Sequence, residues 1–346
     1  MAVHEIVLVG EAYERGFTHG RKFARLIHEA VREYCKFDAS LNERVGAFRQ
    51  NMTAYLADIF PELLEELRGI GDGAGIEFND ILSLNFFPGP TNLPIYCTNI
   101  VLADTSDGPI HGKTSDIGSD YKYYLLQRTS PAEGGEEFLS VGWVGTIWSE
   151  VGINSAGLAM GQSSAPVMPG QDGTGIPALV MPRPVLQHCK STEEAVEFMV
   201  RFQMAGKGIN VALLDQTGHG VVVEKAFDRQ AVREADEGAV FCSNHFVEDG
   251  MQGTIPLKIE GIEENSIGRY ELLTQVLGNR ERVALKGWDY MAELLRIHAT
   301  EERPGICQHV PPYLTSWYAY IQLPKKREMW ICDGPPCQGD FVNYTL

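Results

Sequence analysis

The chain reads IYCTNIVLAD over residues 95–104, and its patterning changes there. Upstream, apolar residues recur every three or four positions, which is typical of amphipathic helices. Downstream they alternate with a period of two, which is typical of strands. The pair Asp107-Gly108 follows, and Asp-Gly is a strong signal for a tight hairpin turn. This hairpin would bring Asp116 back towards Cys97 at the head of the first strand, so we take Cys97 as the candidate nucleophile.

Three helices are predicted before this stretch. Residues 18–37 carry an amphipathic pattern behind Thr18, a candidate N-cap. Residues 48–67 continue the helical period, with Pro61 as a break or kink. Residues 79–86 predict a short third helix. The upstream segment is therefore predicted to be helical.

Hairpins dominate the rest of the chain. Because they outnumber βαβ crossovers, we predict an α+β fold of antiparallel sheets with helices packed outside, built as one main domain. The pattern Ser191-Thr192-Glu193-Glu194 is a capping box that opens a helix. The other predicted helices are 266–278 and 287–297, and the predicted strands are 98–103, 109–115, 122–128, 137–143, 146–151, 209–215, 220–226, 239–243, 316–323 and 327–332.

Residues 87–94 are rich in proline, a composition that resists both helix and strand and predicts an exposed loop. The loop delivers the chain to Tyr96-Cys97. Backbone cleavage needs an accessible, unpaired peptide bond, and this is a natural place for one.

Composition excludes several classes of partner. The 346 residues carry a formal charge of −17, spread along the chain, so nucleic acids and anionic membranes would be repelled. No apolar run approaches the roughly 18–20 residues of a membrane span, and the first residues lack the pattern of a signal peptide. We expect a soluble cytoplasmic protein; whether it forms a homo-oligomer is left open.

The seven cysteines fit reduced thiols better than a disulfide framework, because they are odd in number and scattered. Cys332 and Cys337 are the one close pair. Their Asp-Gly-Pro-Pro spacer and the lack of a second pair argue against a zinc site there. We therefore expect no metal and no cofactor.

A catalytic thiol needs a base or a cationic neighbour, because the thiolate is the nucleophile. A cut before Cys97 would supply the base, since the new α-amino group has a reference pKa of roughly 7.7–8.0. Without a cut, an imidazole is required, and His245 and His309 are the candidates. A buried cysteine can also be a simple small hydrophobe.

Acyl chemistry also needs donors for the oxyanion, and Asn244 and Asn154 are candidates. Asp116 could orient the α-ammonium group or the thiol. Lys113 and Arg269 could lower the pKa of the thiol or hold a carboxylate. Each has a plain structural alternative: turn capping for the asparagines and Asp116, and a surface charge for Arg269.

A series of short motifs spans nearly the whole chain, and their order and spacing carry more weight than any one of them. They resemble the acyl-coenzyme A:6-aminopenicillanic acid acyltransferase family, also classed as the C45 peptidases, within the N-terminal nucleophile (Ntn) hydrolases. The motifs are GFTHG at 16–20, Cys97-Thr98, KTSD at 113–116, GINSAGL at 152–158, Arg183, Asn210, Glu224, SNHF at 243–246, SIGR at 266–269 and DGP at 333–335.

The resemblance implies a four-layer αββα sandwich and a precursor that cleaves itself between Tyr96 and Cys97. The helical segment 1–96 and the sandwich domain 97–346 would stay associated. In family terms Asp116 contacts the new amino terminus, Asn244 serves the oxyanion hole and Arg269 matches an active-site arginine. The chain departs from the family at Tyr96, where members often have glycine, and at Lys113, where related amidases often carry arginine.

We expect an amidohydrolase or acyltransferase that acts on a small acyl-amide through a thioester, with hydrolysis favoured and no requirement for coenzyme A. The loops at 117–121, 143–148 and 162–172 could form an apolar acyl pocket, and their large side chains could equally be core. Two other hypotheses stay open: a Cys/His protease that is not cut, and a binding protein on the same scaffold. The candidate pocket residues are Tyr121, Trp143, Trp148 and Met168.

Overall fold

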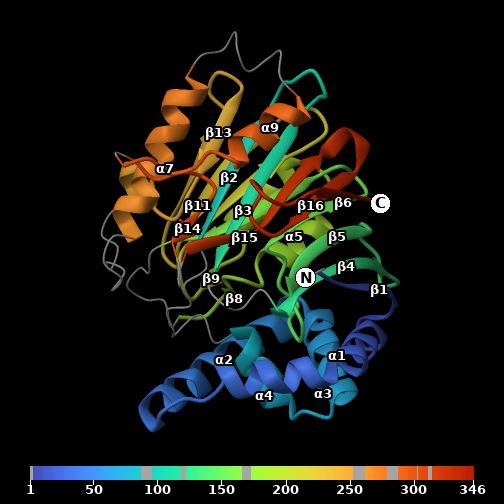
Figure 1. Ribbon diagram of the computed structural model, residues 1–346. Helices are drawn as coiled ribbons and strands as arrows, with labels where there is room; N and C mark the ends of the chain where they lie inside the picture. Colours follow the sequence, from blue (N-terminus) through green and yellow to red (C-terminus); the bar gives the residue numbers. More distant parts are fainter. Residues whose placement is uncertain are drawn as a thin grey trace.

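The computed structural model (Figure 1) describes residues 3–86, 96–117, 122–165, 173–251, 262–278, 287–301, 303–310 and 314–346. The helices are α1 (Ala12–Tyr34), α2 (Ala39–Ile59), α3 (Pro61–Ala74), α4 (Phe78–Phe86), α5 (Pro182–His188), α6 (Thr192–Arg201), α7 (Ile262–Leu277) and α9 (Trp288–Leu295). The strands are β1 (His4–Gly10), β2 (Tyr96–Leu102), β3 (Ile110–Ile117), β4 (Tyr124–Pro131), β5 (Phe138–Trp143), β6 (Val151–Asn154), β7 (Ala159–Ser164), β8 (Ile176–Pro177), β9 (Met204–Ala205), β10 (Ile209–Leu214), β11 (Gly220–Lys225), β12 (Gln230–Glu234), β13 (Ala239–Cys242), β14 (His309–Val310), β15 (Leu314–Leu323), β16 (Glu328–Asp333) and β17 (Phe341–Thr345).

Two sheets form the centre of the molecule. Sheet A has the strand order β1-β4-β5-β6-β7-β10-β11-β12, and sheet B has the order β13-β2-β3-β15-β16-β17 with β14 paired to β15. The sheets pack face to face through β2 against β7 and β10. Helices α5 and α6 pack on the outer face of sheet A. Helices α7 and α9 pack on the outer face of sheet B (Figure 1). The predicted α+β fold and its αββα layers are confirmed.

Strand β2 is buried on both faces, and its second half, residues 100–102, is apolar throughout. Ile100 and Leu102 pack towards α7 and α9, whereas Val101 packs towards sheet A. On the sheet A side, Asn99 Nδ2 donates a hydrogen bond to Ser163 Oγ of β7 at 2.6 Å. The strand that begins with Tyr96-Cys97 is therefore fixed from both sides.

The N-terminal segment contributes a strand as well as helices. β1 pairs in parallel with β4 at the edge of sheet A, which the sequence did not predict. Helix α1 begins at Ala12 behind Glu11, earlier than the expected cap at Thr18. The Arg15 guanidinium, buried between α1 and the sandwich, donates to both carboxylate oxygens of Glu133 at 2.7 Å and to Glu66 at 2.9 Å. The segment is thus joined to the domain through a sheet and buried ion pairs.

Helices α1 and α3 approach closely because glycines face one another across the contact. A Cβ atom at Gly16 would lie 1.9 Å from the Glu66 carbonyl oxygen, and one at Gly20 would lie 2.1 Å from that of Ile70. We expect Gly16→Ala to destabilise the protein by about 1–3 kcal/mol or more, because the helices must separate to admit the methyl group. Urea unfolding measures this.

Gly46→Ala is the matched control. Gly46 lies within α2, and no atom is near its hypothetical Cβ. Alanine there should stabilise the helix by about 0.5–1 kcal/mol. Equal unfolding midpoints for the two variants would contradict close packing at Gly16.

Most hairpins and helices agree with the sequence prediction. Pro61 begins α3 and so separates it from α2, and Ser191 caps α6 by accepting a hydrogen bond from Glu194 N–H at 3.2 Å. The predicted strand at 146–151 is wrong, because the segment stays irregular until β6 begins at Val151. The sequence also missed α5, β12 and β17, the last of which pairs with β16.

The predicted loop at 87–94 lies outside the described residues, as do large parts of the proposed pocket loops at 118–121 and 166–172. No described helix has the length and apolar character needed to cross a bilayer.

Candidate active site

Cys97 lies near the start of β2, and its side chain is fully buried. The strand register pairs Cys97 with Ser115 and Tyr96 with Asp116 on β3. Because side chains alternate between the two faces of a strand, the Cys97 thiol faces sheet A, whereas Asp116 faces the helices over sheet B. The hairpin does bring Asp116 beside the start of β2, but on the face opposite the thiol.

A buried polar group surrounds the thiol. Lys113 Nζ donates to Cys97 Sγ at 3.1 Å and to Glu150 Oε1 at 2.6 Å. The Cys97 Sγ lies 3.8 Å from the same Glu150 oxygen. Ser115 Oγ also donates to Glu150 Oε1, and Tyr124 OH donates to Oε2 at 2.6 Å. We call Lys113, Ser115, Tyr124 and Glu150 the thiol-side group.

The charges in the thiol-side group affect the pKa of the Cys97 thiol. Burial raises the pKa of Cys97 to about 12, although Lys113 acts to lower it. Burial also opposes the charge of Lys113, but Cys97 and Glu150 outweigh this and raise its pKa. Burial likewise opposes the charge of Glu150, yet Lys113 brings its pKa below the usual range. The uncut chain therefore places the Cys97 thiol beside a buried ion pair whose lysine favours the thiolate, while burial opposes it.

A second group holds the backbone of Cys97. The Cys97 N–H donates to Asn244 Oδ1 at 3.1 Å. Arg269 Nη1 donates to the Cys97 carbonyl oxygen at 2.8 Å, and its Nη2 donates to Asn244 Oδ1 at 2.8 Å. Arg269 comes from α7, so the helix over sheet B reaches the start of β2. We call Asn244, Arg269 and Asp116 the backbone-side group.

Asp116 completes this group through Arg269. Its Oδ2 lies 3.8 Å from Arg269 Nη1, and its Oδ1 accepts a hydrogen bond from Ser316 Oγ at 2.6 Å. Burial raises the pKa of Asp116, while Arg269 opposes that rise. The carboxylate is placed to fix the arginine that binds the Cys97 carbonyl.

Asn244 links the two faces of the site. One of its Nδ2 hydrogens is donated to the Ser164 carbonyl oxygen at 2.8 Å. The Ser164 hydroxyl accepts in turn from Lys207 Nζ at 2.7 Å. Lys207 is buried, and burial lowers its pKa to about 8. This lysine next to the site was not singled out from the sequence.

The Asn154 side chain and the Trp148 indole N–H make their hydrogen bonds outside the thiol-side group. Both hydrogens of Asn154 Nδ2 are donated to the carbonyl oxygens of Leu186 and Cys189, and its Oδ1 accepts from the Leu158 N–H. Its contacts are those of a residue that holds a turn. Trp148 Nε1 donates to the Asn85 carbonyl oxygen at 2.9 Å.

The aromatic pair Trp148 and Trp143 belongs to the main apolar core, and their ring centroids lie 5.5 Å apart. This placement matches the core alternative for both residues. The other two proposed pocket residues, Tyr121 and Met168, lie outside the described residues.

Glu150 is the functional candidate that sequence reasoning missed. It follows Trp148 and precedes β6, and it was absorbed into the predicted strand at 146–151. The signal available was an acidic residue inside the otherwise apolar and small-residue stretch TIWSEVGIN, residues 146–154. A buried carboxylate needs a charged or hydrogen-bonding partner, and only the fold shows that this partner is Lys113.

The imidazole partners proposed for an uncut Cys/His protease lie elsewhere. His245 Nδ1 lies 2.8 Å from Ser266 Oγ, and His309 Nε2 lies 3.3 Å from Cys307 Sγ. In the described part of the chain, the polar side chains that contact Cys97 Sγ are Lys113 and Glu150. The structure therefore contradicts a Cys97–imidazole pair with either histidine.

A sequence model of one family, described as acyl-coenzyme A:6-aminopenicillanic acid acyl-transferase, matches residues 103–295, which is more than half of the chain. The chain belongs to this acyl-transferase family. The matched region begins after Cys97 and includes Lys113, Asp116, Asn244 and Arg269. This match confirms the family that the sequence motifs predicted.

Individual relatives are distant. An uncharacterized protein from Archaeoglobus fulgidus is 25% identical over 327 residues, covering 78% of this chain and 54% of its own length. Protein dcd1A from Dictyostelium discoideum is 23% identical over 239 residues, covering 57% of this chain and 53% of its own. The chain thus spans about half the length of each of these two relatives. A crystal structure of a mutant conjugated bile acid hydrolase from Clostridium perfringens aligns with a TM-score of 0.47 and 12% identity, over 72% of this chain and 97% of that one.

Proposed function

We propose that this member of the acyl-transferase family is a self-processing amidohydrolase or acyltransferase whose nucleophile is Cys97. Its substrate would be a small acyl-amide, with hydrolysis favoured over transfer, and neither a metal nor coenzyme A would take part in the reaction. The observation that carries the proposal is the placement of Cys97: its thiol contacts Lys113 and Glu150, while Asn244 and Arg269 hold its backbone N–H and carbonyl.

Self-processing would begin with the thiol of the intact chain. Cys97 Sγ attacks the Tyr96 carbonyl carbon, and its proton passes towards Glu150, the carboxylate nearest to it. The C–N bond between Tyr96 and Cys97 breaks, the nitrogen gains a proton, and a thioester remains. Water then opens the thioester, which leaves a carboxylate on Tyr96 and a free thiol and α-amino group on Cys97.

The processed enzyme would use its new amino group as the base. This group has a reference pKa of roughly 7.7–8.0 and belongs to the same residue as the thiol, so it can take up the thiol proton. The thiolate attacks the substrate amide and forms a thioester, the amine leaves with a proton, and water or a second amine accepts the acyl group. Asn244 is the proposed oxyanion donor, and Lys113 would stabilise the thiolate.

Intact-mass spectrometry and N-terminal sequencing of the purified protein test this proposal. We expect two associated fragments, 1–96 and 97–346, with Cys97 as the first residue of the larger one. A single chain that hydrolyses amides would overturn self-processing. A single chain that is inactive on a panel of acyl-amides, with a thiol no more reactive towards iodoacetamide than a free cysteine, would instead favour a binding protein.

A further inference from the structure

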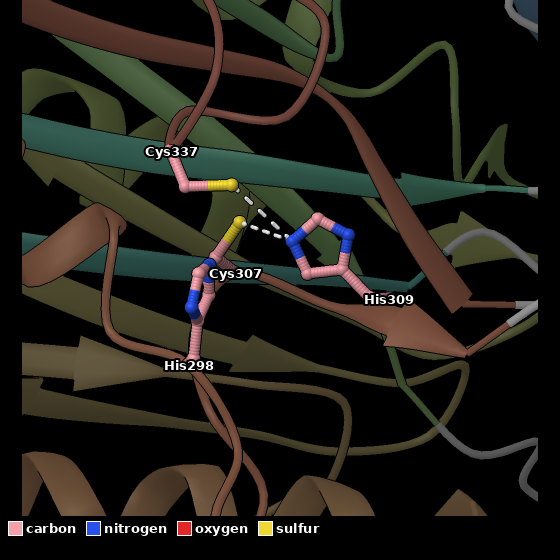
Figure 2. A group of neighbouring side chains, drawn as sticks. All are labelled: His298, Cys307, His309 and Cys337. Atoms are coloured by element: carbon pink, nitrogen blue, oxygen red, sulfur yellow. Dashed lines mark hydrogen bonds between the residues drawn. The ribbon is translucent and has the colours of Figure 1, made fainter.

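A cluster of sulfur and imidazole side chains lies at one end of sheet B, away from the thiol-side group. His298 follows α9, Cys307 precedes β14, His309 is the first residue of β14, and Cys337 lies in the turn between β16 and β17. Figure 2 shows the four side chains converging from these three segments. Each offers one ligand atom, and these atoms all lie within 4.8 Å of one another.

The distances resemble those around a tetrahedral metal ion. His309 Nε2 lies 3.3 Å from Cys307 Sγ and 3.3 Å from Cys337 Sγ (Figure 2). Two ligand atoms on a tetrahedral zinc ion, at the usual Zn–S and Zn–N lengths, lie about 3.5 Å apart. The His298 and His309 rings meet edge to face with centroids 5.1 Å apart, so small side-chain rotations would bring the fourth ligand into place.

We propose that His298, Cys307, His309 and Cys337 bind one zinc ion. Two thiolates and two imidazoles form a ligand set that zinc prefers in structural sites, and four protein ligands leave no open position for a reacting water. Access is also suitable: Cys307 is buried, Cys337 is half-buried, and both histidines are exposed, so an ion can enter from solvent.

The ion would link three segments, two of which are already joined by the backbone: the Ile306 and Cys307 N–H groups donate to the Ile297 carbonyl oxygen at 2.7 and 2.9 Å. Among the described residues, strand β14 pairs with β15 over two residues. The turn carrying Cys337 is joined to the end of α9 by Arg296 Nε, which donates to the Pro336 carbonyl oxygen at 2.8 Å. A zinc ion would add bonds between the same turn, β14 and the segment after α9. It would act as a clip at the end of sheet B.

The proposed zinc site also lies next to residues that hold Asp116 and Arg269 of the backbone-side group in place. Gln308 stands between the ligands Cys307 and His309. Its N–H donates to Ser316 Oγ at 2.8 Å, and that hydroxyl donates to Asp116.

The Gln308 side chain makes the second connection. Its Oε1 accepts from Asn265 Nδ2 at 3.2 Å, and Asn265 Oδ1 accepts from Arg269 Nε at 2.9 Å. Ordering of residues 307–309 by the ion would therefore help to position both Asp116 and Arg269.

The sequence did not reveal this site because its ligands have no regular spacing. The close spacing of Cys332 and Cys337 suggested Cys332 as the neighbour of Cys337, but the structure places Cys307 and His309 beside Cys337. Cys332 is buried in the core behind α9, and its Sγ lies 3.5 Å from the Gly334 carbonyl oxygen. Cys337 instead points towards Cys307 and His309 (Figure 2). Strands β15 and β16 separate those two residues from Cys337 in the sequence.

Metal analysis of the full-length protein tests the proposal. After incubation with zinc and removal of excess by gel filtration, we expect about one zinc per chain. Cys337→Ser and His309→Asn should retain less than about a tenth of that amount, because each removes a ligand. Cobalt in place of zinc should give a tetrahedral spectrum with thiolate-to-cobalt charge transfer, and chelation should lower the thermal unfolding midpoint of the native chain but not of Cys337→Ser.

Cys332→Ala is the matched control, because it removes a buried thiol five residues from Cys337 that is not a proposed ligand. It should bind zinc and cobalt like the native chain. Equal metal loss in Cys332→Ala and Cys337→Ser, or no zinc retained by the native chain, would overturn the site. A Cys307–Cys337 disulfide found by peptide mapping of the protein purified without reductant would also overturn it. None of these readouts depends on enzymatic activity.

Discussion

Cys97→Ala is expected to give a single uncut chain that has lost amide hydrolysis by roughly 10³-fold or more. The substitution removes the atom that would attack both the Tyr96 carbonyl and the substrate, and loss of a nucleophile eliminates the chemistry that its partners support. The fold should persist, because the change is small and the backbone hydrogen bonds to Asn244 and Arg269 do not involve the thiol. Denaturing electrophoresis and an amidase assay measure the two effects together.

Two further variants make this result decisive. Cys97→Ser keeps a weaker nucleophile, and we expect slow cleavage at the same bond. Cys35→Ala removes a half-buried thiol at the end of α1 and should be cut and active like the native chain. A Cys97→Ala chain that is still cut before residue 97 would show that the nucleophile lies elsewhere.

Lys113→Met is expected to combine a large loss of stability with a block in processing. The substitution leaves the Glu150 carboxylate buried without its cation, and breaking a buried ion pair in this way costs about 3–5 kcal/mol. It also removes the donor to the Cys97 thiol, which should slow cleavage by roughly 10²–10⁴-fold. Stability is measured by urea unfolding in a Cys97→Ala background, so that every chain compared is uncut.

Adding Glu150→Gln separates the two roles of Lys113. The double variant removes both buried charges, and we expect it to recover most of the lost stability, to within about 1–2 kcal/mol of the parent. It should not recover cleavage when Cys97 is present, because the charges that act on the thiol remain absent. Recovery of both would show that Lys113 only balances Glu150.

An exposed ion pair provides the control for this series. Lys122 and Glu33 are joined at 3.2 Å, with about two-fifths of each side chain exposed. Lys122→Met should cost less than about 1 kcal/mol, because solvent screens such pairs. A cost as large as that of Lys113→Met would contradict the importance of burial at the site.

The local parts of this architecture could be predicted from the sequence. The β2–β3 hairpin follows from Asp107-Gly108, and the α6 cap follows from Ser191, because both depend on neighbouring residues. Strand β1 could not be predicted in the same way. Its partner β4 lies more than a hundred residues away, and a parallel pairing leaves no turn signal between the two strands.

For the candidate site too, the local contacts could be predicted from the sequence and the long-range contacts could not. The hairpin places Lys113 and Asp116 close to Cys97, and the sequence indicated both, together with Asn244 and Arg269 by family resemblance. It did not indicate that Lys113 and Asp116 serve opposite faces of β2, nor that Glu150 joins the thiol. Those facts depend on how sheet A packs on sheet B, which is a long-range property without a local pattern.

The edge position of β1 has a consequence for the processed protein. If the chain is cut between Tyr96 and Cys97, the terminal strand of sheet A belongs to a different polypeptide from the seven strands beside it. The small fragment then acts as a cover for the backbone groups of β4, and its loss would leave an unpaired strand able to recruit another molecule. A solution from which residues 1–96 have been stripped should therefore aggregate rather than yield a smaller soluble enzyme, and in a processed protein the short fragment would shield β4 from pairing with other molecules.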